Sequence, residues 1–401
     1  MHQPSTKKSF LIFLSVFIFV AGATYLISLI ARGYQFSLVS GPNLKATGLL
    51  SATSTPKSAS VYINNRLITA TDDTVNLSPD TYTVKIVKDG YLPWQKEIVI
   101  KKEVVFQTDA KLFRSVPDLR PITLSGAINP IISPDNSKII YAVASASASQ
   151  DNGLYQLDLT DRPLPLNKNL PRQLYPNYAN INWSQFQFQF SPDSRSILAT
   201  NPQKNISYLV NLDNLAGSRQ FYDITSQIDI IQKEWQHQIF ENLNQRFTQL
   251  PLEIQQAIST PSASNLAFSS NDTKVLYLTN QDSTLKNSYM SPPPAQSTQP
   301  QDRHLKTDNY YVYDLKDDTN FLIGSQPDIQ NPFWLPNSSN IIYTQDQQIK
   351  VIEYDATNNL TLFAKNFSPQ VVFPWPSGNR IITLTAAYPG APQNLYTISL
   401  Q

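Results

Sequence analysis

The side chains that most often carry enzyme chemistry are scarce in this sequence of 401 residues. There is no cysteine, which excludes disulfides, thiolate metal sites and cysteine nucleophiles. The three histidines, His2, His237 and His304, support no serine–histidine–aspartate arrangement. No HExxH motif, glycine-rich phosphate loop or EF-hand spacing is present. The sequence therefore predicts no catalytic residue, no cofactor-binding residue and no metal ligand, and no cofactor.

Two aspartates are the strongest remaining candidates for a ligand. Asp135 and Asp193 occupy the same place in two similar segments, SPDNSKIIYA and SPDSRSILAT. The structural interpretation is that each side chain hydrogen-bonds the nearby backbone and forms a turn. Calcium ligation is the alternative, although no clustered carboxylates accompany the pair. Sequons at Asn205 and Asn366 matter only in a host that glycosylates them.

The composition indicates a folded, β-rich chain without a strong electric field. Hydrophobic residues make up 41% and charged residues 15%, with 29 prolines and 20 tyrosines. Thirty-one basic residues against 30 acidic ones leave a net charge of +1. Because no global field attracts a polyanion, nucleic acid is not an expected partner.

The N-terminus predicts a membrane segment. Residues 10–30 read FLIFLSVFIFVAGATYLISLI, an uncharged stretch that as a helix is about 30 Å long, enough to cross a bilayer. Lys7 and Lys8 precede it, so the positive-inside rule places a tail of residues 1–9 in the cytoplasm. The chain after Arg32 is then extracytoplasmic, in a single-pass protein of the cell membrane. A signal peptide cleaved after Ala23 and a buried core helix are the alternatives.

A small β-domain follows a linker of residues 31–46. Period-2 alternation over 47–113, with a turn at Asp89-Gly90, predicts an antiparallel β-sandwich. Its stretches resemble those of the PEGA domain family: PKSA at 56–59, VYIN at 61–64, LSPDTYTV at 77–84 and GY at 90–91. The resemblance implies an extracytoplasmic β-sandwich of bacteria, often beside a membrane anchor, without catalysis. A generic immunoglobulin-like spacer is the alternative.

The two similar segments belong to a set of five repeats over residues 114–401. They begin at 133 (SPDNSKIIYA), 191 (SPDSRSILAT), 269 (SSNDTKVLYL), 335 (LPNSSNIIYT) and 375 (WPSGNRIITL). Each has a short strand before the polar turn and further strands after it, which predicts a β-propeller of about five blades. An open β-sandwich or another blade count is the alternative. The last repeat lacks a fourth strand, so residues 120–124 are expected to complete it through Ile122 and Leu124 and close the ring.

These repeats resemble the TolB-like family of WD40-type propellers. The hallmark of that family is a Ser-Pro-Asp-Gly-type turn, which SPDN and SPDS match except at the glycine. The resemblance implies a binding scaffold, commonly for protein partners. The chain as a whole is thus expected to be all-β apart from its membrane helix and one helical insertion.

Two insertions interrupt the repeats. Residues 223–258 predict an amphipathic helix, capped by Ser226 and ended by Pro251. Its apolar face comprises Ile228, Ile231, Trp235, Ile239, Leu243, Phe247 and Leu250. This face either packs on the propeller or docks a partner or a membrane. Residues 281–309, rich in proline and glutamine, predict a flexible loop, with a polyproline-type ligand as the alternative.

The sequence leaves two classes of function. The first is a non-catalytic, membrane-anchored binding scaffold whose propeller engages a protein or a cell-wall component, with structural glycan binding as a variant. The second is a propeller hydrolase or lyase with its site at the channel mouth, which would need several convergent carboxylates or histidines. Because such candidates are few, we expect a scaffold and not an enzyme.

Overall fold

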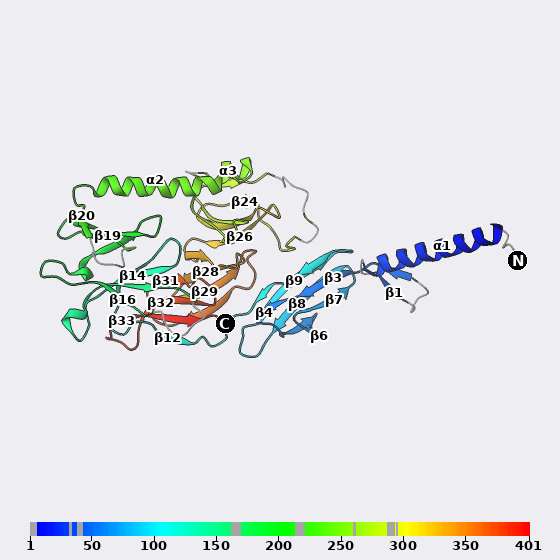
Figure 1. The fold of residues 1–401 in the computed structure, drawn as a ribbon, viewed down its shortest axis with the longest axis horizontal. Helices are drawn as coiled ribbons and strands as arrows, with labels where there is room; N and C mark the ends of the chain where they lie inside the picture. Colours follow the sequence, from blue (N-terminus) through cyan, green and yellow to red (C-terminus); the bar gives the residue numbers. More distant parts are fainter. Residues whose placement is uncertain are drawn as a thin grey trace. The chain divides into compact units, whose positions relative to one another are not determined.

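The computed structural model describes residues 6–31, 34–37, 43–161, 170–212, 221–259, 262–286, 293 and 296–401. The chain divides into two compact units. Unit 1 contains residues up to Leu112 together with Pro292–Gln299, and unit 2 contains Phe113–Ser291 and Pro300–Gln401. Figure 1 shows unit 1 mostly in blue to cyan and the sheets of unit 2 from cyan to red.

The N-terminal helix is longer than predicted. Helix α1 spans Thr6–Ala31, because the polar residues Thr6 to Ser9 include no helix breaker and continue the helix beyond the apolar stretch. Its segment Phe10–Leu29 is long and apolar enough to cross a membrane, and none of it is buried, although a signal sequence has the same properties. Residues 1–5 of the predicted tail lie outside the described residues. The predicted linker contains two short paired strands, β1 (Gln35–Ser37) and β2 (Asn43–Lys45).

The rest of unit 1 is a small β-sandwich. One sheet has the order β6-β5-β8-β9 and is antiparallel throughout. Its strands are β5 (Ser60–Ile63), β6 (Arg66–Ala70), β8 (Asp80–Val87) and β9 (Trp94–Ile100). Val84, Ile86 and Trp94 of this sheet are buried in a common core with Leu50 of the other sheet. The alternation read from the sequence therefore points the correct faces inward.

The prediction of a purely antiparallel sandwich was wrong for the second sheet. Strands β3 (Gly48–Ala52) and β7 (Asp73–Leu77) are antiparallel, but β10 (Val105–Gln107) pairs in parallel with β3. Likewise β11 (Ala110–Lys111) is parallel to β4 (Ser54–Thr55). The first and last strands of the domain are far apart in sequence, so no hairpin forces them to be antiparallel.

Unit 2 consists of four-stranded antiparallel sheets, one for each sequence repeat. Sheet 1 contains β13 (Ile128–Ile132), β14 (Lys138–Val143), β15 (Gly153–Asp158) and β16 (Arg172–Pro176). Sheet 2 contains β17 (Gln187–Phe190), β18 (Ser196–Asn201), β19 (Ile206–Asn211) and β20 (Phe221–Asp223). Sheet 3 contains β21 (Ala263–Phe268), β22 (Lys274–Thr279), β25 (Asn309–Asp314) and β26 (Thr319–Ser325). Sheet 4 contains β27 (Gln330–Trp334), β28 (Asn340–Gln345), β29 (Gln348–Glu353) and β30 (Leu360–Ala364).

Sheet 5 joins the two ends of unit 2, as the sequence predicted. Its order is β12-β33-β32-β31, with β31 (Val372–Pro374), β32 (Arg380–Ala386) and β33 (Gln393–Ser399) from the last repeat. Strand β12 is Leu119–Pro121, so the paired residues lie earlier than the expected 120–124, and Leu124 is exposed. The shift has a local cause: Thr123 Oγ1 accepts from the amide of Leu395 and donates to Asn394 Oδ1, which turns the chain toward β13.

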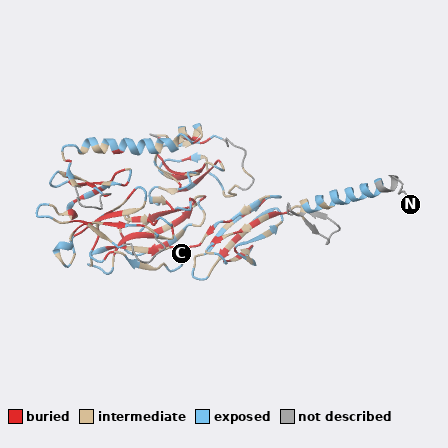
Figure 2. Cartoon of the chain, viewed as in Figure 1, coloured by how far each residue is buried: buried red, intermediate tan, exposed pale blue. Residues whose placement is uncertain are grey.

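Neighbouring sheets pack through their apolar faces, as blades of a propeller do. One core lies between sheets 1 and 2, another between sheets 3 and 4, and a third between sheets 5 and 1. Figure 2 shows buried residues following the strands of these sheets. A blade cannot bury both faces alone, so this stacking provides most of the apolar burial.

Sheets 2 and 3 are joined differently, through the helical insertion. Helix α2 (Ile228–Phe247) packs Trp235 against Leu198 of sheet 2. Helix α3 (Leu252–Ile258) packs Ile254 and Ile258 against Val275 of sheet 3. The two helices therefore cover the faces that would otherwise meet. Figure 1 shows α2 running along the outside from β20 to α3.

Three details of the helix prediction need correction. The N-terminal cap position is Gln227, without a side-chain hydrogen bond, instead of Ser226, because a turn from Ile224 to Gln227 precedes the helix. Ile239, at the centre of the predicted apolar face, is 50% exposed. Only Trp235 of α2 is buried, and the helix contacts sheet 2 through its N-terminal half and sheet 3 through its C-terminal end.

The segment 281–309 is not one flexible loop. Strands β23 (Ser283–Thr284) and β24 (His304–Leu305) pair within it, and Leu285 and Leu305 are buried beside Tyr277 and Tyr311 of sheet 3. These two buried leucines attach the segment to sheet 3. The proline- and glutamine-rich composition of the segment did not indicate this attachment. Within unit 1, Thr298 Oγ1 and Gln299 Nε2 donate to the carbonyl of Glu97 in β9. Residues 287–292, 294 and 295 lie outside the described residues.

Candidate functional site

The repeat turns use their aspartates for structure. Ser133 Oγ donates to Asp135 Oδ1, and the same oxygen accepts from the amide of Ser137 at 3.0 Å. Ser191 and Asp193 repeat the first contact at 2.6 Å, and the amide of Arg195 donates to Asp193 at 3.1 Å. Both aspartates therefore form the side-chain turns expected of them.

The charge state of these aspartates follows from the same contacts. Burial alone would raise the pKa of Asp135, but hydrogen bonds from Ser133 and Ser137 outweigh it and hold that pKa below its usual value. The hydrogen bond from Ser191 is the main cause of the lowered pKa of Asp193. Among the described residues no group of three or more histidine, aspartate or glutamate side chains is placed to hold a metal ion. The calcium alternative therefore has no additional ligands there.

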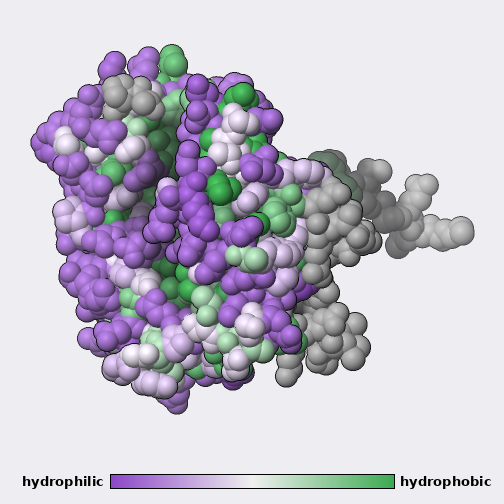
Figure 3. Space-filling model, turned by 90° about the vertical axis from the view of Figure 1, so that its left-hand side faces the viewer, coloured by the Kyte–Doolittle hydropathy of each residue, from purple (hydrophilic) through white to green (hydrophobic). Residues whose placement is uncertain are grey.

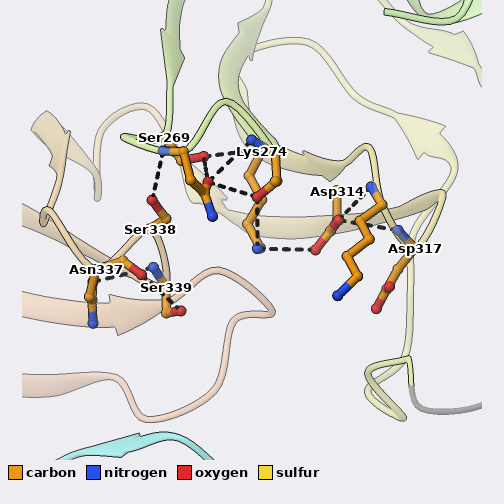
Figure 4. Close-up of polar contacts among 10 residues, drawn as sticks. Ser269, Lys274, Asp314, Asp317, Asn337, Ser338 and Ser339 are labelled. Atoms are coloured by element: carbon orange, nitrogen blue, oxygen red, sulfur yellow. Dashed lines mark hydrogen bonds and ion pairs between the residues drawn. The ribbon is translucent and has the colours of Figure 1, made fainter.

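The turns also connect neighbouring sheets. Ser194 Oγ of sheet 2 accepts from the amide of Asp135 at 3.3 Å, and Ser338 Oγ of sheet 4 accepts from the amide of Asn271 at 3.1 Å. Figure 4 shows this second contact beside the buried ion pair of Lys274 Nζ with Asp314, 3.3 Å apart. The two serine contacts join one blade to the next, whereas the ion pair joins neighbouring strands of sheet 3, so these polar groups already have protein partners.

The histidines and the sequon asparagines do not form a common site among the described residues. His237 lies on the exposed surface of α2, and His304 is exposed in β24, 3.8 Å from Asp302. His2 is outside the described residues. Asn205 and Asn366 of the two sequons are both exposed.

The loops opposite the repeat turns form the second end of the ring. Because the strands alternate in direction, this end carries the β14–β15, β18–β19 and β32–β33 connections. It also carries the start of α2 (Figure 1). We call it the insertion face. Figure 3 shows that it is largely hydrophilic, with hydrophobic atoms at the bottom of narrow hollows.

A cavity of about 410 Å³ lies on the insertion face beside the first strands of sheets 1 and 5. Asn129, Ser145, Ser368, Gln370 and Gln393 provide most of its polar groups. No aspartate, glutamate or histidine is among the residues that line it. The convergent carboxylates that a channel-mouth enzyme would require are therefore not found among the described residues of this cavity.

A larger cleft of about 690 Å³ lies between sheets 4 and 5. We call it the aromatic cleft, because Phe363, Phe367, Tyr388 and Tyr396 line it. The two phenylalanines are buried with ring centroids 6.1 Å apart, whereas Tyr388 is 67% exposed. Leu119 of the closing strand β12 forms a further part of the lining.

Two loops build the aromatic cleft, and hydrogen bonds hold them together. The segment after β30 carries Lys365, Asn366 and Phe367, and the β32–β33 connection carries Tyr388. Thr385 Oγ1 donates to the carbonyl of Asn366 at 2.6 Å, which fixes one loop against the other. Lys365 is the only lysine, arginine, aspartate or glutamate of the lining. Such a surface favours a neutral partner that offers apolar contact and hydrogen bonds.

The aromatic cleft was not predicted from the sequence. Its phenylalanines, tyrosines and Leu119 come from separate repeats and from the closing strand, and only the closed ring brings them together. The available signal was Tyr388-Pro389-Gly390, an aromatic residue in a turn of the last repeat.

The fold and site define an all-β chain in which a small sandwich precedes a β-propeller. The PEGA domain family matches residues 47–115, which confirms the resemblance seen in the sequence. No curated protein sequence matches the chain.

Three solved structures show partial similarity. An oligogalacturonate lyase in complex with manganese is 10% identical over 84% of this chain and 82% of its own, with a TM-score of 0.23. TolB from Acinetobacter baumannii is 14% identical over 80% of this chain, with a TM-score of 0.20, and the chain spans 60% of TolB. An oligogalacturonate lyase from Vibrio parahaemolyticus is 8% identical over 80% of this chain and 86% of its own, with a TM-score of 0.25. TM-scores this low carry no argument about function.

Proposed function

We propose that this protein is a non-catalytic binding scaffold, anchored in the cell membrane by α1 and exposed outside the cytoplasm. The aromatic cleft is the observation that carries the proposal. It combines a volume of about 690 Å³ with exposed and buried aromatic rings and a single formal charge, at Lys365. Aromatic rings contribute large contact area at low entropic cost, which suits recognition of a protein segment or a sugar ring of the cell envelope.

The anchor and the PEGA domain support the extracytoplasmic location. Phe10–Leu29 is long enough to span a bilayer, and Lys7 and Lys8 lie on its N-terminal side. The sandwich that the PEGA family matches, residues 47–115, follows the anchor in the sequence, and the resemblance to that family implies an extracytoplasmic domain. In this proposal it acts as a spacer for the propeller.

The test is site-specific photocrosslinking in cells. A photoreactive amino acid replaces Tyr388 in the full-length chain, and the matched control replaces Tyr222, which is 53% exposed on sheet 2. The proposal expects one dominant envelope adduct at position 388 that is absent at 222. Equal adduct patterns at both positions, or none at either, would contradict it.

A further inference from the structure

A third cavity of unit 2 has a different chemistry from the aromatic cleft. It measures about 470 Å³ and lies on sheet 5, beside β12 and β33. Arg114, Arg120 and Arg380 line it, with Asp118 as the only carboxylate side chain of the lining. Ser399 and Gln401 contribute polar side chains. The lining therefore carries three guanidinium groups against one side-chain carboxylate and is rich in hydrogen-bond donors.

Two of the three guanidinium groups are held in place. Arg120 Nε is 2.6 Å from Asp118 Oδ2. Arg380 lies 3.3 Å from Asp161 and places its guanidinium carbon 4.3 Å from the centroid of the Trp375 ring. Each arginine keeps further N–H groups beyond these contacts, since a guanidinium has five.

The third guanidinium, Arg114, makes no ion pair with any residue that the structure describes. Its side chain is exposed at the pocket. Its backbone amide donates a hydrogen bond to the carbonyl of Leu400, which holds the backbone of Arg114 in place. An arginine without an ion pair among the described residues, beside two oriented ones, offers a fork that a carboxylate or phosphate can fill.

A buried hydrogen-bond donor without a partner also favours a ligand that accepts hydrogen bonds. Gln401 Nε2 is buried and has no acceptor among the described residues. A buried amide donor without a partner costs roughly 1–3 kcal/mol, so an acceptor at this position would relieve that cost. Gln401 lines the same pocket as the arginines.

We propose that this arginine pocket binds an oxyanion, the carboxylate or phosphate group of a small ligand or of a polymer. Arg114 supplies the free fork, Arg120 and Arg380 supply oriented donors, and Gln401 donates through Nε2. Arg120 is 76% exposed, so the binding is screened by salt and its affinity is modest. The proposal does not depend on the aromatic cleft.

The experiment is equilibrium dialysis of the full-length chain in a non-ionic detergent with radiolabelled citrate and, separately, inorganic phosphate. Ionic strength is held constant with chloride. Arg114→Gln and Arg120→Gln should each weaken saturable binding at least tenfold. The matched control Arg66→Gln, in β6 of unit 1, should leave it unchanged.

Each outcome decides the proposal. Saturable binding of citrate alone identifies a carboxylate ligand, and binding of phosphate alone identifies a phosphate ligand. No saturable binding of either anion overturns the proposal, and so does wild-type binding by both arginine variants. Circular dichroism confirms that Arg114→Gln is folded, so loss of binding is not confused with loss of structure.

Discussion

The fourth position of every repeat turn has a left-handed backbone. The φ angles are positive at Asn136, Ser194, Asp272, Ser338 and Gly378. Left-handed conformations cost an L-residue roughly 1 kcal/mol, less for asparagine and aspartate and least for glycine. The resemblance to the propeller family leads one to expect glycine at this position in every repeat. The left-handed geometry explains why small polar residues and one glycine occupy it here.

We predict opposite effects of two substitutions at Asn136. Asn136→Gly should raise the free energy of unfolding by about 0.5 kcal/mol, because φ of 57° suits glycine. Asn136→Ile should lower it by roughly 1–3 kcal/mol, since a β-branched residue is strained there. Urea denaturation of both variants measures the difference. Equal stability of the two would refute the role assigned to this turn.

Lys111 gives a pH prediction. Burial lowers its pKa to about 8, from an ordinary value near 10.5. Below pH 8 the lysine is charged in both the folded and the unfolded state. The burial of its charge then lowers the free energy of unfolding by the full amount. Between pH 8 and 10.5 the folded state loses the proton while the unfolded state keeps it, so stability rises with pH.

Replacing Lys111 with methionine should remove this dependence. We expect Lys111→Met to gain on the order of 1–2 kcal/mol at pH 7 and to lose the rise between pH 8 and 10.5. Urea denaturation at several pH values measures both. A variant with the wild-type slope would show that another group titrates.

At the scale of elements, helix α2 is attached to sheet 2 by its N-terminal half and to sheet 3 by its C-terminal end. Trp235 is 8% exposed against Leu198, Phe247 packs with the cluster of sheet 3, and Arg246 pairs with Asp272 at 3.3 Å. Figure 2 shows the helix exposed along most of its length. The helix therefore serves as a bridge between two sheets, and its stability comes from these contacts more than from an extended apolar face.

Trp235→Ala should weaken the contact between the N-terminal half of α2 and sheet 2. Truncating a buried tryptophan costs about 3 kcal/mol, which we expect to appear as faster hydrogen exchange of α2 amides and a lower urea midpoint. Ile230→Ala, at a position that is 70% exposed, is the control and should change stability by less than about 0.5 kcal/mol. Unchanged exchange in Trp235→Ala would contradict the bridge.

The sequence predicted which segments form helices and strands better than it predicted what these helices and strands contact in the fold. Periodicity identified α2 and placed Trp235 inward, because spacing of apolar residues determines a helix face. It could not show that Ile239 would remain half-exposed, since that depends on the gap between sheets 2 and 3. The aromatic cleft was missed for the same reason: its lining is set by ring closure through Leu119 and not by any local pattern.

For the whole molecule, the proposed topology is testable because the chain has no cysteine. Ser5→Cys and Ser115→Cys each introduce a single thiol, one in the predicted tail and one after the sandwich. A membrane-impermeant maleimide should label Ser115→Cys in intact cells and Ser5→Cys only after lysis. The reverse pattern would invert the orientation, and loss of position 5 from the mature chain would show cleavage of α1.

The most direct test of the scaffold is binding of the full-length chain to envelope material through the aromatic cleft. Detergent-solubilised wild type, Tyr388→Ala and Tyr222→Ala are compared for saturable co-sedimentation with isolated sacculi and for recovery of envelope proteins after crosslinking. We predict that Tyr388→Ala weakens one of these interactions at least tenfold, while Tyr222→Ala binds as wild type does. Wild-type binding by Tyr388→Ala in both assays would show that the cleft is not the binding site.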